Sequence, residues 1–120
     1  MGEPSRPRVK VLWIRPEYLQ EILAGRKTIE VRVGYSNIRK LRTGDLLRLN
    51  DTYFYRIRRI AQYPDFEALL AHEPTEAIAP GISEEELRRA LRSIYPPEKE
   101  ALGVIALEIE PASEQDVQEH

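Results

Sequence analysis

The charged side chains of Lys27, Glu30 and Arg32 lie close together in residues 25–32, whose sequence is GRKTIEVR. Lys27 and Arg32 are cations that can hold an anion such as phosphate, Arg32 through a planar fork of donors and Lys27 as a point charge. Glu30, between them, can accept a hydrogen bond from a bound group or take a proton from it. The alternative is a ladder of exposed ion pairs, each worth only about 0 to 1 kcal/mol. Spacing alone favours that ladder.

A helix followed by a strand would position these side chains. Pro16 suits the first position of a helix, and Gly25 suits the left-handed residue that ends one. A strand over residues 28–33 then places alternate side chains on opposite faces: Ile29, Val31 and Val33 on one, and Thr28, Glu30 and Arg32 on the other. The apolar face must lie on a core, so the polar face looks either at water or into a cleft.

The length and composition predict one domain with no membrane segment. The chain has 120 residues, no Cys and two His. We therefore expect no disulfide, no metal site and no cofactor, and we see no spacing typical of a catalytic triad or a phosphate-binding glycine loop. No apolar run is long enough to span a bilayer, and the N-terminus lacks the apolar core of a secretory signal, which favours the cytoplasm. We expect a flexible arm over residues 1–8, a domain over 9–110 and an acidic tail over 111–120.

Charge is distributed unevenly along the chain. Residues 1–59 hold 14 Lys and Arg against 6 Asp and Glu, whereas residues 60–120 hold 4 against 14. Segregation of this kind favours a basic surface for an anionic ligand, with phosphates as the obvious candidate. The alternative is that the two halves neutralise each other in the fold.

The remaining pattern predicts a small sheet with helices beside it. Strands are expected at 9–14, 45–50, 53–60 and 104–109, with a hairpin turn at Asn50 and a bulge at Arg58 and Arg59. Asp65 can cap a short helix, and Ser83 with Glu86 forms a capping box for a longer one. Strands and helices do not alternate as a doubly wound sheet requires, so a compact barrel fits best.

Aromatic side chains offer a second route to a ligand. Tyr35 lies in a basic connection, and Tyr53 or Tyr55 lies near several arginines, so these rings could stack on bases at about 1 to 3 kcal/mol each. We expect Trp13, Phe54 and Phe66 to fill the core instead. The apolar stripe from Leu87 to Ile94 is also expected to be core.

The GRKTIEVR run matches the GxKxxExR signature of the ASCH domain, and later segments resemble other landmarks of that family in the same order. These are Thr43-Gly44-Asp45, residues 63–70 (YPDFEALL), Ser93 to Pro96 (SIYP) and residues 103–109 (GVIALEI). The resemblance implies an α+β fold, a small PUA-like β-barrel of about five to six strands with two to four helices packed beside it. It also implies that Lys27, Glu30 and Arg32 line a cleft proposed to bind RNA or a nucleotide.

One branch of that family with a similar layout removes the acetyl group from N4-acetylcytidine, with a Lys, a Thr and a Glu as its proposed machinery. The Lys corresponds to Lys27, but the Thr position is Glu30 here, and Thr28 would need a different geometry. The distant acid is not assigned, with Glu73 and Glu76 as candidates. An RNA-cleaving activity, also proposed in the family, would depend on Lys27, Glu30 and His72.

The sequence therefore predicts an ASCH-like protein that binds RNA or a nucleotide, with Lys27 and Arg32 on phosphate and Glu30 on the base or ribose. If it is an enzyme, Lys27 and Glu30 are the catalytic pair. An amidohydrolase is the second hypothesis, and a ribonuclease or a protein-docking module comes third; a monomer and a homodimer both remain open. The predicted ligand-binding residues are Lys27, Thr28, Glu30, Arg32, Arg15, Tyr35, Arg58 and Arg59.

Overall fold

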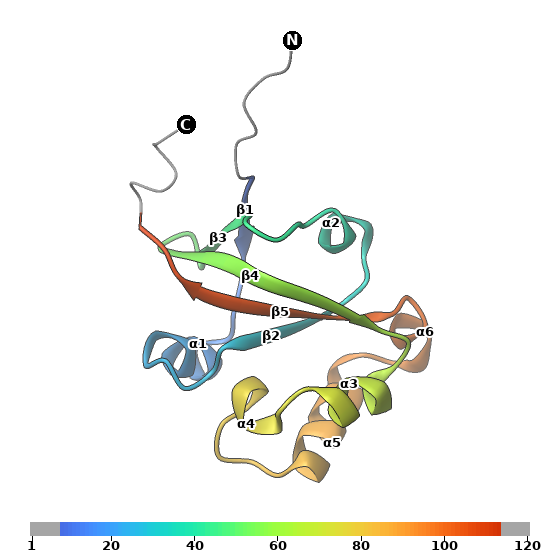
Figure 1. Cartoon of the computed structure of the whole chain (residues 1–120). Coiled ribbons are helices and arrows are strands. Elements are labelled where there is room, and N and C mark those ends of the chain that lie inside the picture. Colours follow the sequence, from blue (N-terminus) through green and yellow to red (C-terminus); the bar gives the residue numbers. More distant parts are fainter. Residues whose placement is uncertain (1–7, 114–120) are drawn as a thin grey trace.

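A single curled sheet of five strands, a half-barrel, organises the protein (Figure 1). The computed structural model describes residues 8–113, so the predicted arm and tail lie largely outside the described residues. The strands are β1 (Val9–Leu12), β2 (Ile29–Val33), β3 (Leu46–Leu49), β4 (Tyr53–Tyr63) and β5 (Val104–Pro111). Their order across the sheet is β1, β3, β4, β5, β2, and only β1 and β3 run parallel. β1 and β2 are thus the two edges.

Six helices lie beside the sheet in residues 8–113. They are α1 (Pro16–Leu23), α2 (Ser36–Arg39), α3 (Phe66–His72), α4 (Thr75–Ile78), α5 (Glu84–Ile94) and α6 (Pro97–Glu100). The number exceeds the predicted two to four because α2, α4 and α6 have four residues each, too few for a helical periodicity to show in the sequence. None of the described helices is long and apolar enough to cross a membrane. The α+β class and the barrel-like sheet are confirmed.

The predicted boundary signals are present. Gly25, which follows the C-cap residue Ala24 of α1, has φ +82°, a conformation that glycine adopts at little cost. The Asp65 carboxylate accepts from the Ala68 amide at 2.9 Å, and Ser83 with Glu86 makes the complete capping box of α5. The register of β4 against β5 shifts between Ile57 and Arg59, at the predicted bulge. Local sequence therefore determined these starts, ends and bends.

Two apolar layers hold the sheet, one on each of its faces. Inside the half-barrel, residues of α1, α2, β3 and β4 pack on Ile105, Leu107 and Ile109 of β5. On the opposite face α3, α4 and α5 pack on β2 and on Val104 and Ala106; Figure 1 shows these helices gathered below the sheet. β5 is buried on both faces, which explains its almost continuous apolar sequence.

The predicted alternation of β2 is also confirmed. Ile29, Val31 and Val33 are buried in the layer shared with α3 to α5. Glu30 and Arg32 point to the other face, where they lie opposite residues 107 and 105 of β5. Because β2 is an edge strand, its second edge is open to the ligand-sized space described next.

Candidate functional site

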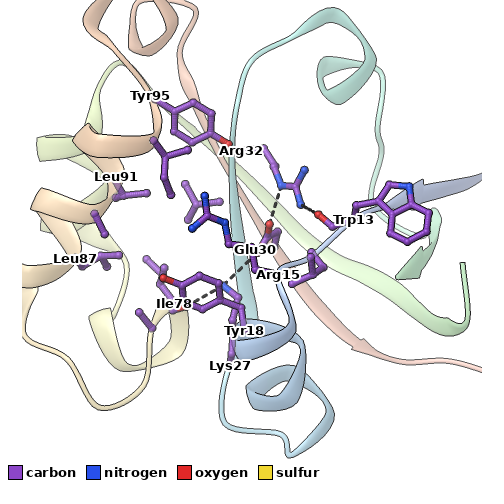
Figure 2. Close-up of a pocket in the computed structure, with 15 residues that line it drawn as sticks. Trp13, Arg15, Tyr18, Lys27, Glu30, Arg32, Ile78, Leu87, Leu91 and Tyr95 are labelled. Carbon is purple, nitrogen blue, oxygen red and sulfur yellow. Dashed lines mark hydrogen bonds and ion pairs between the residues drawn. The ribbon is translucent and has the colours of Figure 1, made fainter. Parts of the chain in front are cut away.

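A pocket of about 230 Å³ lies along the free edge of β2 (Figure 2). One side is polar and comes from β2 and the start of α1, while the other is apolar and comes from α4 and α5. Three cations and one acid line it, so its charged groups sum to a positive value. The lining residues are Trp13, Ile14, Arg15, Tyr18, Lys27, Glu30, Val31, Arg32, Ile78, Ala79, Leu87, Ala90, Leu91, Ile94 and Tyr95.

Lys27 closes the base of the pocket. Its Nζ donates to the carbonyl oxygens of Ile29 at 2.6 Å and Ile78 at 2.8 Å, and lies 3.2 Å from Glu30 Oε1. These three acceptors match the three N–H donors of the ammonium group. Lys27 is only 5% exposed. Burial lowers its pKa, and the carboxylate of Glu30 opposes that shift. Lys27 thus ties β2 to α4 and holds Glu30.

Glu30 and Arg32 form the polar wall above Lys27. Arg32 Nε donates to Glu30 Oε2 at 2.7 Å, and Arg32 Nη2 donates to the carbonyl oxygen of Trp13 at 2.9 Å. Each Glu30 oxygen therefore has one cationic partner and keeps capacity for a second hydrogen bond. Arg32 Nη1 bonds to no group in residues 8–113. The wall can accept through Glu30 and donate through Arg32.

The main chain of Val31 adds an unpaired donor and acceptor. In an antiparallel pair, alternate residues exchange hydrogen bonds and the residues between them point away from the partner strand. The amide of Ile109 donates to Thr28 O and that of Gly34 to Gly103 O, which sets residues 28, 30, 32 and 34 as the bonded positions. Val31 then directs its N–H and C=O away from β5, on the side where Lys27 meets Ile29 O. These two groups have no partner among the described residues.

The apolar wall comes mainly from α5. Leu87 and Leu91 are buried, as predicted for the core stripe. The prediction was wrong for Ile94, which is 44% exposed and lines the pocket instead of joining the buried layer on β2. Tyr95 continues this wall, and burial raises its pKa. This apolar wall could pack against the face of a flat apolar ligand.

Trp13 was expected in the core, but it is 68% exposed. β1 ends at Leu12, and the buried Leu12 and Ile14 leave the intervening ring on the outside. The alternation of side chains along an extended segment could have predicted from the sequence that Trp13 faces away from Leu12 and Ile14. Arg15 also lines the pocket, and its side chain bonds to no other described group. The centre of the Tyr18 ring, which also lines the pocket, lies 5.9 Å from Lys27 Nζ.

Several predicted residues lie elsewhere. Thr28 is exposed and does not line the pocket, and Tyr35 is exposed and lines a neighbouring hollow. Arg58 pairs with Glu108 and Glu110, and Arg59 pairs with Glu108. These β4 to β5 pairs neutralise part of the charge asymmetry within the fold.

The candidate distant acids are separate from the pocket. Glu73 is buried, accepts two hydrogen bonds from Arg59 at 2.7 and 3.0 Å, and accepts a third from the Tyr63 hydroxyl. The pKa of Glu73 is lowered, chiefly by Arg59. Glu76 is exposed. The His72 ring stacks on Tyr63 and its Nδ1 lies 2.8 Å from Ala68 O, so its contacts are local to the end of α3.

The family model of the ASCH domain matches residues 12–113. The chain belongs to the ASCH domain family. Two solved structures resemble this ASCH domain over most of their length. The crystal structure of hypothetical protein PH0355 has a TM-score of 0.81 and 31% identity, covering 88% of this chain and 99% of its own. The solution structure of protein PF0455 from Pyrococcus furiosus has a TM-score of 0.73 and 31% identity, covering 88% and 98%. Among curated proteins, none matches the ASCH domain described here.

Proposed function

We propose that this ASCH domain binds a nucleotide unit, such as one in RNA, with the base in the pocket at the edge of β2. The observation that carries the proposal is the pairing of an apolar wall with a polar strand edge inside one positively charged pocket. A base has an apolar face and a hydrogen-bonding edge, and its phosphate is an anion, so each part has a matching surface. The volume of about 230 Å³ lies below the roughly 300 to 1,000 Å³ of pockets for larger ligands.

Separate residues serve the three parts of the ligand. Leu91, Ile94 and Tyr95 contact the face of the base. Glu30 meets its hydrogen-bonding edge together with the N–H and C=O of Val31, which have no partner in residues 8–113. Arg32 attracts the phosphate together with Arg15, whose side chain is unpaired among the same residues.

Lys27 has a supporting role in this proposal. All three of its donors already have protein acceptors, so direct contact with phosphate would require it to give up one of them. Its positive charge still contributes to the field in the pocket. Its main effect is to fix the carboxylate of Glu30, because that ion pair is almost completely buried.

Titration with mononucleotides tests the proposal. AMP, CMP, GMP and UMP, and the four matching nucleosides, would be added to the ¹⁵N-labelled protein at low and high salt. We expect amide shifts along β2 and α5 for at least one base, tighter binding with the phosphate than without it, and weakening as salt rises. Arg15→Ala and Arg32→Ala should weaken binding, whereas Arg42→Ala, which removes an exposed cation outside the pocket, should not. A protein unresponsive to all four nucleotides would refute the proposal.

Hydrolysis is less well supported by the same geometry. Of the described residues that line the pocket, none is Ser, Thr or Cys. Lys27 is buried and fully hydrogen-bonded, so it is a poor nucleophile as it stands. We expect incubation with N4-acetylcytidine to give no deacetylation above that of a Glu30→Ala variant, and clear turnover would instead favour the amidohydrolase.

A further inference from the structure

A second hollow of about 230 Å³ adjoins the pocket on the other side of Arg32. The two spaces share three residues, Trp13, Arg32 and Tyr95. Figure 2 shows the ring of Trp13 on the opposite side of Arg32 from Leu87 and Leu91. The hollow is built from β1, α2 and Tyr95, and its lining residues are Lys10, Val11, Leu12, Trp13, Arg32, Tyr35, Asn37, Ile38 and Tyr95.

The lining of this hollow suits another nucleotide. It includes the cations Lys10 and Arg32, and none of the described lining residues is acidic. Trp13 and Tyr35 are exposed aromatic rings on which a base can stack. Lys99 Nζ lies 5.3 Å from the centre of the Tyr35 ring, which adds positive charge nearby. Asn37 offers an amide that can both donate to and accept from a base edge.

Arg32 lines both spaces, so a phosphate that joins two bases, one in each space, would lie near its guanidinium. Its Nε and Nη2 are fixed by Glu30 and Trp13 O, while its Nη1 bonds to no described residue. A guanidinium held on two sides loses little freedom when it binds a phosphate oxygen through the third.

We propose that the ligand is a single-stranded oligonucleotide of at least two nucleotides, with one base in the β2 pocket and the next stacked in the second hollow. This inference rests on the proposed function, because the first base occupies the same pocket. RNA and DNA share the required chemistry, namely two bases joined by a phosphodiester. Arg32 contacts the linking phosphate, and Tyr35 and Asn37 contact the second base.

Comparison of 5′-phosphorylated mononucleotides with the corresponding 5′-phosphorylated dinucleotides tests the inference. Trp13 is the only tryptophan in the chain and lies where the two spaces meet, so its fluorescence reports on both. We expect the dinucleotide to bind about fivefold or more tightly than the mononucleotide, since that is the smallest gain that stacking of one base typically gives. Parallel RNA and DNA series reveal which sugar is preferred, and a gain in either supports the inference.

Variants test which residues provide the higher affinity for the dinucleotide. Tyr35→Ala and Asn37→Ala should reduce the dinucleotide advantage while mononucleotide affinity stays the same. Tyr53→Ala is the matched control, because Tyr53 is 39% exposed against 40% for Tyr35 and lies outside both spaces. Lys10→Gln and Lys40→Gln form a second pair of variant and control, because Lys10 lines the second hollow and Lys40 does not. We expect the dinucleotide advantage to fall only in Lys10→Gln. Shifts of the Asn37 side-chain amide on adding dinucleotide, but not mononucleotide, give an independent readout in the unmodified protein.

The outcomes separate the two proposals. Mononucleotide binding without any dinucleotide gain, or a gain that survives in the Tyr35→Ala and Asn37→Ala variants, overturns this inference and leaves the β2 pocket as a nucleotide site. Failure of every mononucleotide and dinucleotide to bind overturns both.

Discussion

Arg32 on β2 donates a 2.9 Å hydrogen bond from Nη2 to the carbonyl oxygen of Trp13, which directly follows β1. β1 and β2 are the two edges of the sheet, so this bond links segments that the sheet itself leaves apart. The same guanidinium holds Glu30 through Nε. The Arg32 side chain therefore connects the two edges of the half-barrel and also fixes the carboxylate of Glu30 in the pocket.

Arg32→Lys tests this double role. Lysine keeps the charge but cannot make two directed contacts from one planar group. We expect nucleotide affinity to fall by about tenfold, which corresponds to about 1.4 kcal/mol. Isothermal titration calorimetry with the best-binding nucleotide measures the change. Arg42→Lys is the control, and equal affinity in the wild type and Arg32→Lys would show that charge alone is sufficient.

Lys27→Met should destabilise the fold. The substitution leaves two carbonyl oxygens and a carboxylate oxygen without their donor in a buried place, at a cost of about 3 kcal/mol or more. Urea denaturation followed by circular dichroism measures the loss. The exposed Lys40→Met should change stability by no more than about 0.5 kcal/mol. If Lys27 acted only as a ligand contact, binding would fall and stability would not.

The Val31 amide should report directly on base binding. Its N–H has no partner in the described chain and points away from β5 at the pocket. A base that accepts from it should move its proton resonance downfield more than those of Glu30 and Arg32, whose amides already bond to β5. A ¹⁵N correlation spectrum recorded during nucleotide titration provides the measurement. An unmoved Val31 amide at saturation would place the base elsewhere.

Stability should fall at acid pH partly through Glu73. Hydrogen bonds from Arg59 hold the pKa of Glu73 below its ordinary value of 4.5 in the folded protein. The unfolded chain therefore binds this proton first, so the stabilisation is complete above pH 4.5 and is lost as the pH falls through the folded-state pKa. Glu73→Gln should lower stability at neutral pH by about 1.5 to 3 kcal/mol and flatten the acid limb of the profile.

Chemical denaturation at a series of pH values provides that comparison. Glu98→Gln, which changes an exposed glutamate without an ion pair among residues 8–113, should leave the acid limb as steep as in the wild type. A Glu73→Gln profile parallel to the wild-type profile would contradict the linkage.

Sequence was sufficient wherever a signal is local. The alternation of β2, the cap at Gly25 and the bulge near Arg59 depend on residues a few positions apart, and all three were predicted. The contact of Lys27 with Ile78 O joins positions 51 residues apart, and it depends on where α4 packs. Nothing in the composition of residues 72–82 specifies that packing. The apolar half of the site was therefore not predicted, although its charged half was.

Phosphate contact by Lys27 was the natural expectation from residue type, because a lysine between charged neighbours resembles a surface cation. Its burial supports the structural role proposed above, since an ammonium group without water must find acceptors in the protein. The assignment of Trp13 to the core was wrong. A large apolar side chain was assigned to the core by type, whereas the alternation of its neighbours places it on the surface.

The place of β5 has a consequence for how the protein forms. β5 is the last described strand in the chain, yet it lies between β4 and β2, and β2 has no other partner in the sheet. Glu30, Val31 and Arg32 therefore cannot take their positions until residues 104–111 have joined the sheet. During synthesis, residues 29–33 can pair in the sheet only after a segment more than 70 residues later in the chain has been made. A chain truncated before Val104 would retain GRKTIEVR intact but would lack the strand that gives this sequence its shape.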